Sequence, residues 1–280
     1  MELSLPRGGF FLIQGSIMFG MWEKELEEMK KAALLAETKI LEIYHSSFKV
    51  ETKSDDSPVT EADKSADKII KDYLQSKFPD YAFLTEESVD TKERLHKDFV
   101  FIIDPVDGTV EFVNKTGGFS TNIALCYKHE IVAGVINIPL EKTTYFATRG
   151  GGAWKEERDK NPLRIHVSNR VGKNLRALIS ISHLIDKERE QIARHKECFE
   201  SVTPCGAATK FCRIAEGEAD VAVRYSVATK EWDTAAGEIL LEEAGGHFTN
   251  LHLEKYTHNR EDVYNRDGYV VVNDMRNALL

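Results

Sequence analysis

The amino-acid sequence predicts a mixed α/β (α+β) fold in which two halves pack as one body around a cleft. Two amphipathic helical patterns open the chain, at residues 22–45 and after residue 60. A series of β-like runs joined by short polar turns then fills residues 99–155, which is typical of an antiparallel meander. From residue 176 onward, strand-like and helix-like segments alternate. No repeat or low-complexity linker separates these parts.

The composition limits the class of protein. The chain has 280 residues, of which 42% are apolar and 30% charged, and its net charge is −9. The acidic balance argues against binding of a nucleic-acid polymer, because such proteins carry a basic face. No segment approaches the ~20 apolar residues of a membrane span, which leaves only peripheral membrane association open. The four cysteines lack metal-ligand spacing and are interpreted as buried free thiols, so we expect a cytoplasmic protein.

The first 21 residues superficially resemble a signal peptide because of the apolar run Phe10-Phe11-Leu12-Ile13. The segment has a single basic residue, Arg7, and no clean cleavage site of the small-x-small type. We therefore expect residues 1–21 to be a disordered extension or the product of a mis-called start codon.

The first half of the chain begins with helices. Apolar residues spaced three and four apart predict an amphipathic helix over residues 22–45. Asp63 stands three residues after Thr60, as in a capping box, which predicts that a second helix begins there. On that evidence alone, Asp63 is interpreted as a helix cap. A short strand at 81–85 then ends at Glu86, so an acidic side chain follows a buried strand.

The most informative stretch begins with the apolar run from Phe99 to Ile103, which predicts a buried strand. Pro105 lacks an N–H and is expected to end the hydrogen-bond ladder of that strand. Asp104 and Asp107 then lie at its carboxyl end, and Gly108 allows a sharp turn whose N–H groups can face an anion. Mg²⁺ beside a phosphate is usually held by such carboxylates. The alternative is an ordinary turn in which both acids cap local amides, and this stretch alone favours neither.

The remaining elements follow from periodicity. Arg149-Gly150-Gly151-Gly152 lacks the ending of a phosphate loop and lies between strands, so it is interpreted as a hairpin. Helices are predicted at 187–200, at 211–215 and from Glu231 to Gly245, where Asp233 alone would be a good N-cap. The other strands are expected at residues 120–127, 131–138, 143–148, 152–155, 176–182, 219–224 and 269–272.

Three separated segments agree with one known family. Thr85-Glu86-Glu87-Ser88, Asp104-Pro-Val-Asp107-Gly-Thr109 and Trp232-Asp233-Thr-Ala-Ala-Gly237 together resemble the signature of the inositol monophosphatase superfamily, in order and in spacing. Members of this superfamily are metal-dependent, lithium-sensitive phosphatases. The resemblance implies a layered αβαβα sandwich of the sugar phosphatase type. It also implies an N-terminal α+β subdomain at 22–160 with the metal site and a C-terminal α/β subdomain at 161–280 that completes the site.

Within the superfamily, the chain resembles the CysQ-type 3'(2'),5'-bisphosphate nucleotidases. The likeness is carried by Asp104–Leu125 (DPxDGTxEFxxxxGxFxxNIAL), Ile181-Ser182-His183, Lys210–Gly217 (KFCxxAEG) and Glu231–Gly237 (xWDTAAG). The chain departs from that pattern at Cys205–Ala208, where alanines replace a serine-bearing turn, and at Ser226–Thr229, where a proline is missing. Both departures concern recognition of the nucleotide and leave the metal ligands intact.

The resemblance implies a role for each matching residue. The metal ligands that it implies, for two Mg²⁺ ions and a weaker third, are Glu86, Asp104, Val106 (through its carbonyl), Asp107 and Asp233. Asp63 and Thr109 would position and deprotonate the attacking water, which replaces the cap interpretation of Asp63. The implied substrate contacts are Glu86, Asp107, Gly108, Thr109, His183, Lys210, Arg224 and Asp233. Metal ions suit this reaction, because a phosphate dianion repels the attacking hydroxide until bound cations neutralise its charge.

The function implied is hydrolysis of 3'-phosphoadenosine 5'-phosphate to AMP and phosphate, which removes a by-product of sulfate activation. The partner is then a small phosphorylated nucleotide, and the chain is a monomer or a homodimer. An inositol or other sugar monophosphatase is the alternative enzyme, and the importance of Lys210 and Arg224 separates the two. A further alternative is a non-catalytic sensor of phosphorylated nucleotides, against which the complete set of acids counts.

Overall fold

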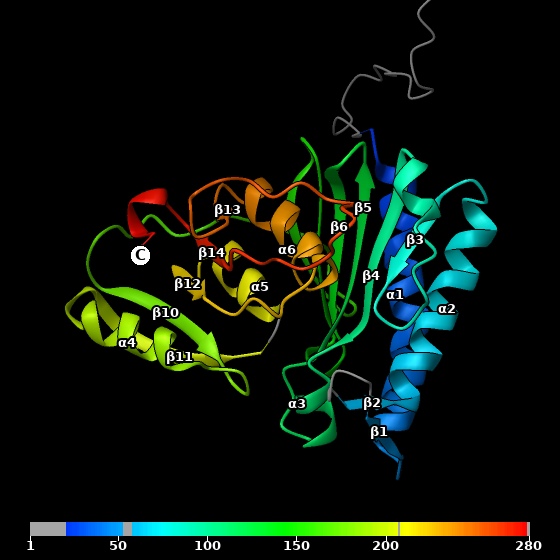
Figure 1. The fold of residues 1–280 in the computed structure, drawn as a ribbon, viewed down its shortest axis with the longest axis horizontal. Helices are drawn as coiled ribbons and strands as arrows, with labels where there is room; N and C mark the ends of the chain where they lie inside the picture. Colours follow the sequence, from blue (N-terminus) through cyan, green and yellow to red (C-terminus); the bar gives the residue numbers. More distant parts are fainter. Residues whose placement is uncertain (1–20, 53–57, 207, 279–280) are drawn as a thin grey trace, which may run out of the picture.

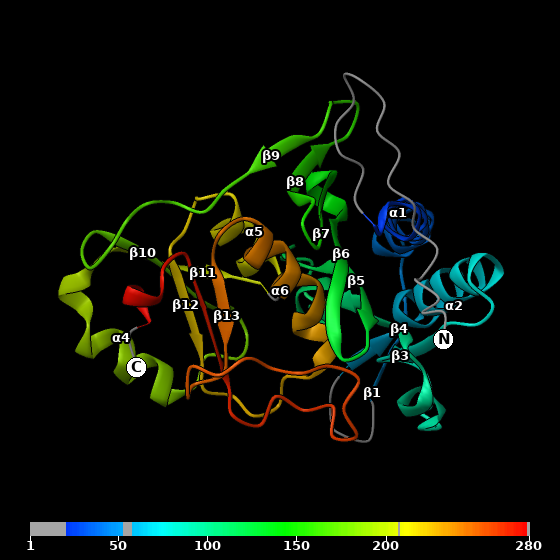
Figure 2. The same cartoon turned by 90° about the horizontal axis from the view of Figure 1, so that it is seen from above.

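The structure is a computed structural model that describes residues 21–52, 58–206 and 208–278. Within these residues, five layers follow one another: two helices, a seven-stranded sheet, two helices, a five-stranded sheet and a last helix (Figures 1 and 2). The predicted layered α/β fold is therefore confirmed. The expected N-terminal extension lies outside the described residues apart from Met21, and the subdomain boundary near residue 160 remains a prediction.

The outermost layer consists of α1 (Glu23–Tyr44) and α2 (Glu61–Lys77), close to the predicted ranges. The apolar spacing explains their position, since Met29, Ala33, Ala36 and Ile40 line one side of α1 and are fully buried. Both helices pack their apolar sides on the same face of the large sheet. Among the described residues, no helix combines the length and the apolar character needed to cross a bilayer.

The seven-stranded sheet holds the strand that leads into the site. Its order is β3-β4-β5-β6-β7-β8-β9, with β3 parallel to β4 and every later pair antiparallel. The meander and the hairpin at Arg149–Gly152 are thus confirmed, while β9 was not predicted. The strands are β3 (Ala82–Thr85), β4 (Phe99–Asp107), β5 (Ser120–Tyr127), β6 (Glu130–Ile138), β7 (Thr143–Thr148), β8 (Gly152–Glu157) and β9 (Leu163–Ile165).

The prediction that Pro105 ends the ladder is wrong. Strand β4 continues to Asp107, and its pairing with β5 skips from Asp104↔Asn122 to Asp107↔Ser120. Pro105 lies in this irregular step, where a missing N–H costs no ladder hydrogen bond. The irregular step bends the end of β4, and the strand continues past it.

The other half of the fold packs on the opposite face of the large sheet. Helices α5 (Thr209–Ala215) and α6 (Glu231–Glu243) lie between the two sheets, and Ala235, Ile239 and Leu241 of α6 are fully buried there. The five-stranded sheet has the order β11-β10-β12-β14-β13. Its strands are β10 (Leu175–Ser180), β11 (Phe199–Cys205), β12 (Val221–Arg224), β13 (His247–Thr249) and β14 (Tyr269–Val272), and α4 (Asp186–Arg194) covers its far face.

Several predictions for the second half need correction. The charged helix expected at 187–200 ends at Arg194, and residues 199–205 form edge strand β11. This strand is mostly exposed and contains Pro204, so it lacks the apolar alternation by which a strand is recognised. The four cysteines are free as expected, but Cys198 and Cys205 are only partly buried. Strand β13 was not predicted, and in the first half the short sheet of β1 (Val50–Thr52) and β2 (Pro58–Thr60) was not predicted either.

Candidate active site

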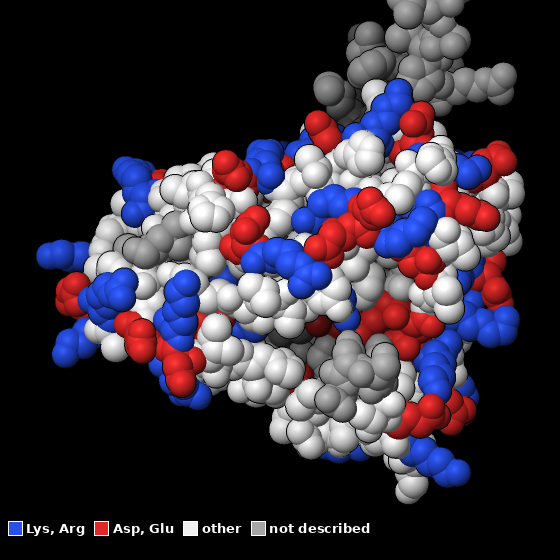
Figure 3. Space-filling model, viewed as in Figure 1, with Lys and Arg blue, Asp and Glu red and all other residues white. Residues whose placement is uncertain are grey.

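A cleft of about 770 Å³ lies between the two halves of the fold. It is lined by the end of β4 and the start of α3 (Thr109–Val113) on one side, and by β12 and the start of α6 on the other. Figure 3 shows Asp and Glu side chains gathered beside a hollow on this face. The cleft brings together the predicted residues Glu86, Asp104, Val106, Asp107, Gly108, Thr109, His183, Lys210, Arg224 and Asp233.

The turn after β4 depends on Gly108. Its φ of +93° lies in the left-handed region, which favours glycine, and a Cβ there would come within 3.2 Å of the Gly118 carbonyl oxygen. The Val106 amide donates to Oδ1 of Asp104 at 3.1 Å, and helix α3 begins directly after Gly108. The turn therefore presents the Asp104 carboxylate, the Val106 carbonyl and the Thr109 hydroxyl at one end of the cleft.

Three carboxylates converge, two from the end of β4 and one from the start of α6. One oxygen from each of Asp104, Asp107 and Asp233 lies within 4.8 Å of the other two. Burial raises the pKa of Asp104 and of Asp233 well above the usual range, and repulsion by neighbouring carboxylates, including Glu86, adds to it. Burial also raises the pKa of Asp107 to about 6, against hydrogen bonds that lower it.

This cluster fits a divalent cation. At neutral pH, several carboxylates whose pKa values are raised by burial and mutual repulsion are stabilised when a positive charge lies between them. Oxygen donors alone are the ligand set of Mg²⁺ and similar hard cations. The hydrogen bonds of described residues occupy one oxygen each of Asp104, Asp107 and Asp233, so each carboxylate retains a second oxygen for a ligand.

Asp63 forms the predicted cap of α2 and also contacts Thr109. Its Oδ2 accepts hydrogen bonds from the Thr60 amide (2.7 Å) and hydroxyl (2.6 Å), which is the capping box at the start of α2. Its Oδ1 accepts from the Thr109 hydroxyl at 3.0 Å. Burial raises its pKa, although those hydrogen bonds lower it. One carboxylate thus caps a helix and contacts a hydroxyl that lines the cleft.

The support of Asp107 was not foreseen from the sequence. Oδ2 of Asp107 accepts from the Asn122 side chain at 2.9 Å and from the Ala208 amide at 2.8 Å. Asn122 is fully buried in β5, where Ser120 donates to its Oδ1 at 3.0 Å. A buried Asn in a strand that continues into an apolar run is the signal that could have revealed this contact. Because Ala208 belongs to the other half, this carboxylate also joins the two halves.

Basic side chains face the same cleft from the second half. Lys210 is 3% exposed, and burial lowers its pKa. Arg224 is 5% exposed and donates to Glu188 at 2.7 Å and to the His183 carbonyl at 3.0 Å. His183 lines the cleft, but its side chain is exposed and the contact with Arg224 uses its backbone. Both cations line the same cleft as the acidic cluster, so an anion bound in this cleft can contact basic side chains.

Three histidines outside the cleft lining, His258, His247 and His252, differ in burial. His258 lies between Glu238 (2.7 Å) and Glu231 (3.7 Å) and is almost completely buried. Burial alone would lower its pKa, but the two glutamates raise the pKa to about 9. His247 and His252 are exposed.

Comparisons with known proteins agree with this geometry. A model of the inositol monophosphatase family matches residues 22–279. The 3'(2'),5'-bisphosphate nucleotidase CysQ of Salmonella typhimurium is 36% identical over 225 residues, which cover 79% of this chain and 89% of that protein. The crystal structure of CysQ from Bacteroides thetaiotaomicron is 32% identical, has a TM-score of 0.78 and covers 90% of this chain and 98% of its own. The extragenic suppressor protein suhB from Bartonella henselae is 27% identical, with a TM-score of 0.76 over 90% and 94% of the two chains.

Proposed function

The chain belongs to the inositol monophosphatase family, and we propose that it hydrolyses 3'-phosphoadenosine 5'-phosphate to AMP and phosphate. The observation that carries the substrate is the pair of buried cations, Lys210 and Arg224, in the cleft that also holds the acidic cluster. One phosphate of a bisphosphate can bind at the acids through cations, while the other needs basic side chains of this kind. The CysQ relatives support the same substrate.

The proposal assigns Mg²⁺ to the acidic cluster. Glu86, Asp104 and the Val106 carbonyl would hold one ion, and Asp104, Asp107 and Asp233 a second, with a third and weaker ion near Glu86. Such ions neutralise the phosphate and lower the pKa of a bound water, so that hydroxide is available at neutral pH. The amides of Gly108 and Thr109 would bind the remaining oxygens of the reacting phosphate.

Asp63 and Thr109 are proposed to activate the water. The Thr109 hydroxyl has one proton and two acceptors, Oδ1 of Asp63 at 3.0 Å and the Val106 carbonyl at 3.2 Å. When it donates to Asp63, a lone pair of Oγ1 can accept the proton of an attacking water. The Asp63 carboxylate then receives the Thr109 proton. No covalent intermediate with the protein is needed, since positioning and electrostatics suffice for phosphoryl transfer to water.

Lys210, Arg224 and His183 are proposed to bind the second phosphate and the ribose. In this proposal the enzyme works in the cytoplasm as a monomer or homodimer and removes a by-product of sulfate activation. The two alanines, Ala207 and Ala208, stand where a serine-bearing turn was expected. The Ala208 amide donates to Asp107, but the alanine side chains have no hydroxyl with which to contact the nucleotide.

The test is phosphate release from 3'-phosphoadenosine 5'-phosphate and from inositol 1-phosphate, measured side by side with Mg²⁺ and with or without Li⁺. We expect faster phosphate release from the nucleotide than from inositol 1-phosphate, and we expect Li⁺ to inhibit this release. Faster release from inositol 1-phosphate would refute the proposed substrate but would remain consistent with metal-dependent hydrolysis. Tight nucleotide binding without turnover would indicate a non-catalytic sensor and would contradict the proposal that the protein hydrolyses the nucleotide.

A further inference from the structure

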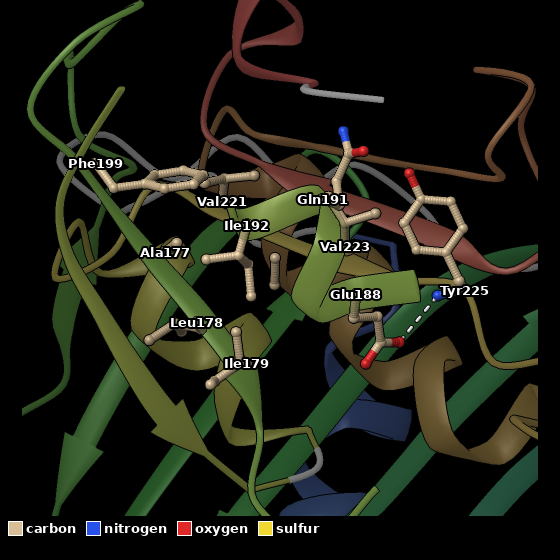
Figure 4. A pocket seen from close by; sticks show the side chains of 11 residues that line it. Ala177, Leu178, Ile179, Glu188, Gln191, Ile192, Phe199, Val221, Val223 and Tyr225 are labelled. Carbon is tan, nitrogen blue, oxygen red and sulfur yellow. Dashed lines mark hydrogen bonds between the residues drawn. The ribbon is translucent and has the colours of Figure 1, made fainter. Parts of the chain in front are cut away.

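Glu188 is a buried carboxylate that the proposed reaction does not use. It lies in the first turn of α4 and is 3% exposed. Figure 4 shows it beside a small pocket whose other lining is mostly apolar, with Ala177, Leu178, Ile192 and Val221 among its residues. An isolated charge in such surroundings costs several kcal/mol, so a buried carboxylate of this kind needs a specific partner.

The partner is Arg224. Oε2 of Glu188 accepts from Nη1 of Arg224 at 2.7 Å, and both side chains are at least 94% buried. Oε1 accepts from the amide of Tyr225, the residue that directly follows β12, at 3.0 Å (Figure 4). Glu188 therefore holds the side chain of Arg224 and the backbone directly after it. This is a tighter fixation than either contact alone would give.

The remaining donors of Arg224 are set by this contact. Among the described residues, both hydrogen bonds of Arg224 use Nη1, one to Glu188 and one to the His183 carbonyl. The guanidinium is a rigid planar fork, so fixing Nη1 also fixes the directions of Nη2 and Nε. Arg224 lines the cleft, whereas Glu188 lies outside that lining. Glu188 therefore does not line the cleft itself, and the cleft residues to which it is hydrogen-bonded are Arg224 and, through its amide at 3.3 Å, Ile185.

We propose that Glu188 is a positioning residue for substrate selectivity: it fixes the Arg224 guanidinium so that its free donors face the 5'-phosphate of the nucleotide. The inference rests on the proposed function, because it needs Arg224 to contact that phosphate. Selectivity for a bisphosphate then depends on a residue outside the cleft. The acidic cluster, which binds the reacting phosphate, is independent of this contact.

The test compares 3'-phosphoadenosine 5'-phosphate with adenosine 3'-monophosphate, which differs only by the absence of the 5'-phosphate. Glu188→Gln keeps an oxygen for the Tyr225 amide and removes the charge that anchors Arg224. We expect kcat/KM for the bisphosphate to fall about tenfold, which corresponds to ~1.4 kcal/mol, and kcat/KM for the monophosphate to change less than about twofold. The matched control is Glu190→Gln, the same change at an exposed position of the same helix, which should alter neither value.

A double-mutant cycle separates positioning from a structural effect. If Glu188 acts through Arg224, then Glu188→Gln combined with Arg224→Ala should lose no more selectivity than Arg224→Ala alone. Additive losses, or equal losses for both substrates, would overturn the positioning role. A wild-type enzyme with no preference for the bisphosphate would instead overturn the proposed function, and this inference with it. Wild-type preference that Glu188→Gln leaves unchanged would overturn the inference alone.

Discussion

The substitution Asp63→Asn tests whether this residue is a proton acceptor or only a helix cap. The Thr60 amide donates to Oδ2 at 2.7 Å, so an asparagine must place its oxygen there to avoid two opposed N–H groups. Its NH₂ group then faces the Thr109 hydroxyl, where Oδ1 now accepts at 3.0 Å. The cap is kept, and the proton acceptor of Thr109 is replaced by a donor.

The expected loss follows from this geometry. The Thr109 hydroxyl can then donate only to the Val106 carbonyl at 3.2 Å, which cannot take up a proton in the reaction. The whole contribution of the general base is lost, about 10²- to 10⁴-fold in kcat, or about 3–5 kcal/mol of activation free energy. Stability should not fall. Burial raises the pKa of Asp63, so its charge opposes folding at neutral pH and the neutral amide removes that cost.

The assay is kcat at saturating Mg²⁺ together with the midpoint of thermal unfolding. Thr60→Ala is the matched control, because it removes the capping hydroxyl and keeps the acid. It should lower stability by about 1 kcal/mol and affect kcat far less than Asp63→Asn. A kcat for Asp63→Asn within about tenfold of the wild type, or a pattern in which Thr60→Ala loses as much, would show that Asp63 serves only the helix.

Three further predictions concern the cleft. Asp104→Asn and Asp233→Asn should each abolish hydrolysis and leave the metal-free protein folded, because both acids are proposed to bind cations and burial of their charges is unfavourable; retained turnover with Mg²⁺ would contradict the ligand assignment. In metal-free protein, burial raises the pKa of Asp107 to about 6, so the folded state binds more protons than the unfolded state and loses stability as the pH rises from about 4 through 6. The rise in unfolding temperature on adding Mg²⁺ should therefore be larger at about pH 7.5 than at about pH 5, and a smaller rise would exclude this linkage. Lys210→Ala should reduce kcat/KM for 3'-phosphoadenosine 5'-phosphate more than for adenosine 3'-monophosphate, and equal reductions would argue against contact with the 5'-phosphate.

The sequence predicted the elements with a strong periodic signal. Strands 120–127 and 143–148 and the first two helices appear almost as expected, since each has an apolar face on a large core. Strand β11 was missed because it lies at a sheet edge, where exposed polar residues and Pro204 remove the alternation. The prediction that Pro105 ends β4 failed because Pro105 lies at an irregular step of the ladder, where a residue without an N–H is tolerated.

The convergence of the acidic residues was predictable where one recognisable segment supplies a carboxylate, whereas the contacts that cross the fold were not. Asp104, Asp107 and Asp233 belong to recognisable segments, and the structure brings them together. The hydrogen bond from the Ala208 amide to Asp107 joins residues 101 positions apart and uses only backbone on one side, so no side chain announces it. Glu188 was missed because a glutamate in the first turn of a charged helix is ordinary. Only its burial against Arg224 distinguishes it.

The hydrogen bond between Ala208 and Asp107 also bears on how the chain is made. Synthesis runs from the N-terminus, so β4 with Asp104 and Asp107 emerges about a hundred residues before the Ala208 amide and before Asp233 on α6. Until α6 emerges, the nascent first half has only part of its acidic cluster. Mutual repulsion of the carboxylates is correspondingly weaker, and a cation finds fewer ligands. A truncated chain that stops before α6 would lack Asp233 and also the buried apolar side chains that α6 contributes to the core, so release of incomplete chains would produce no partly active phosphatase.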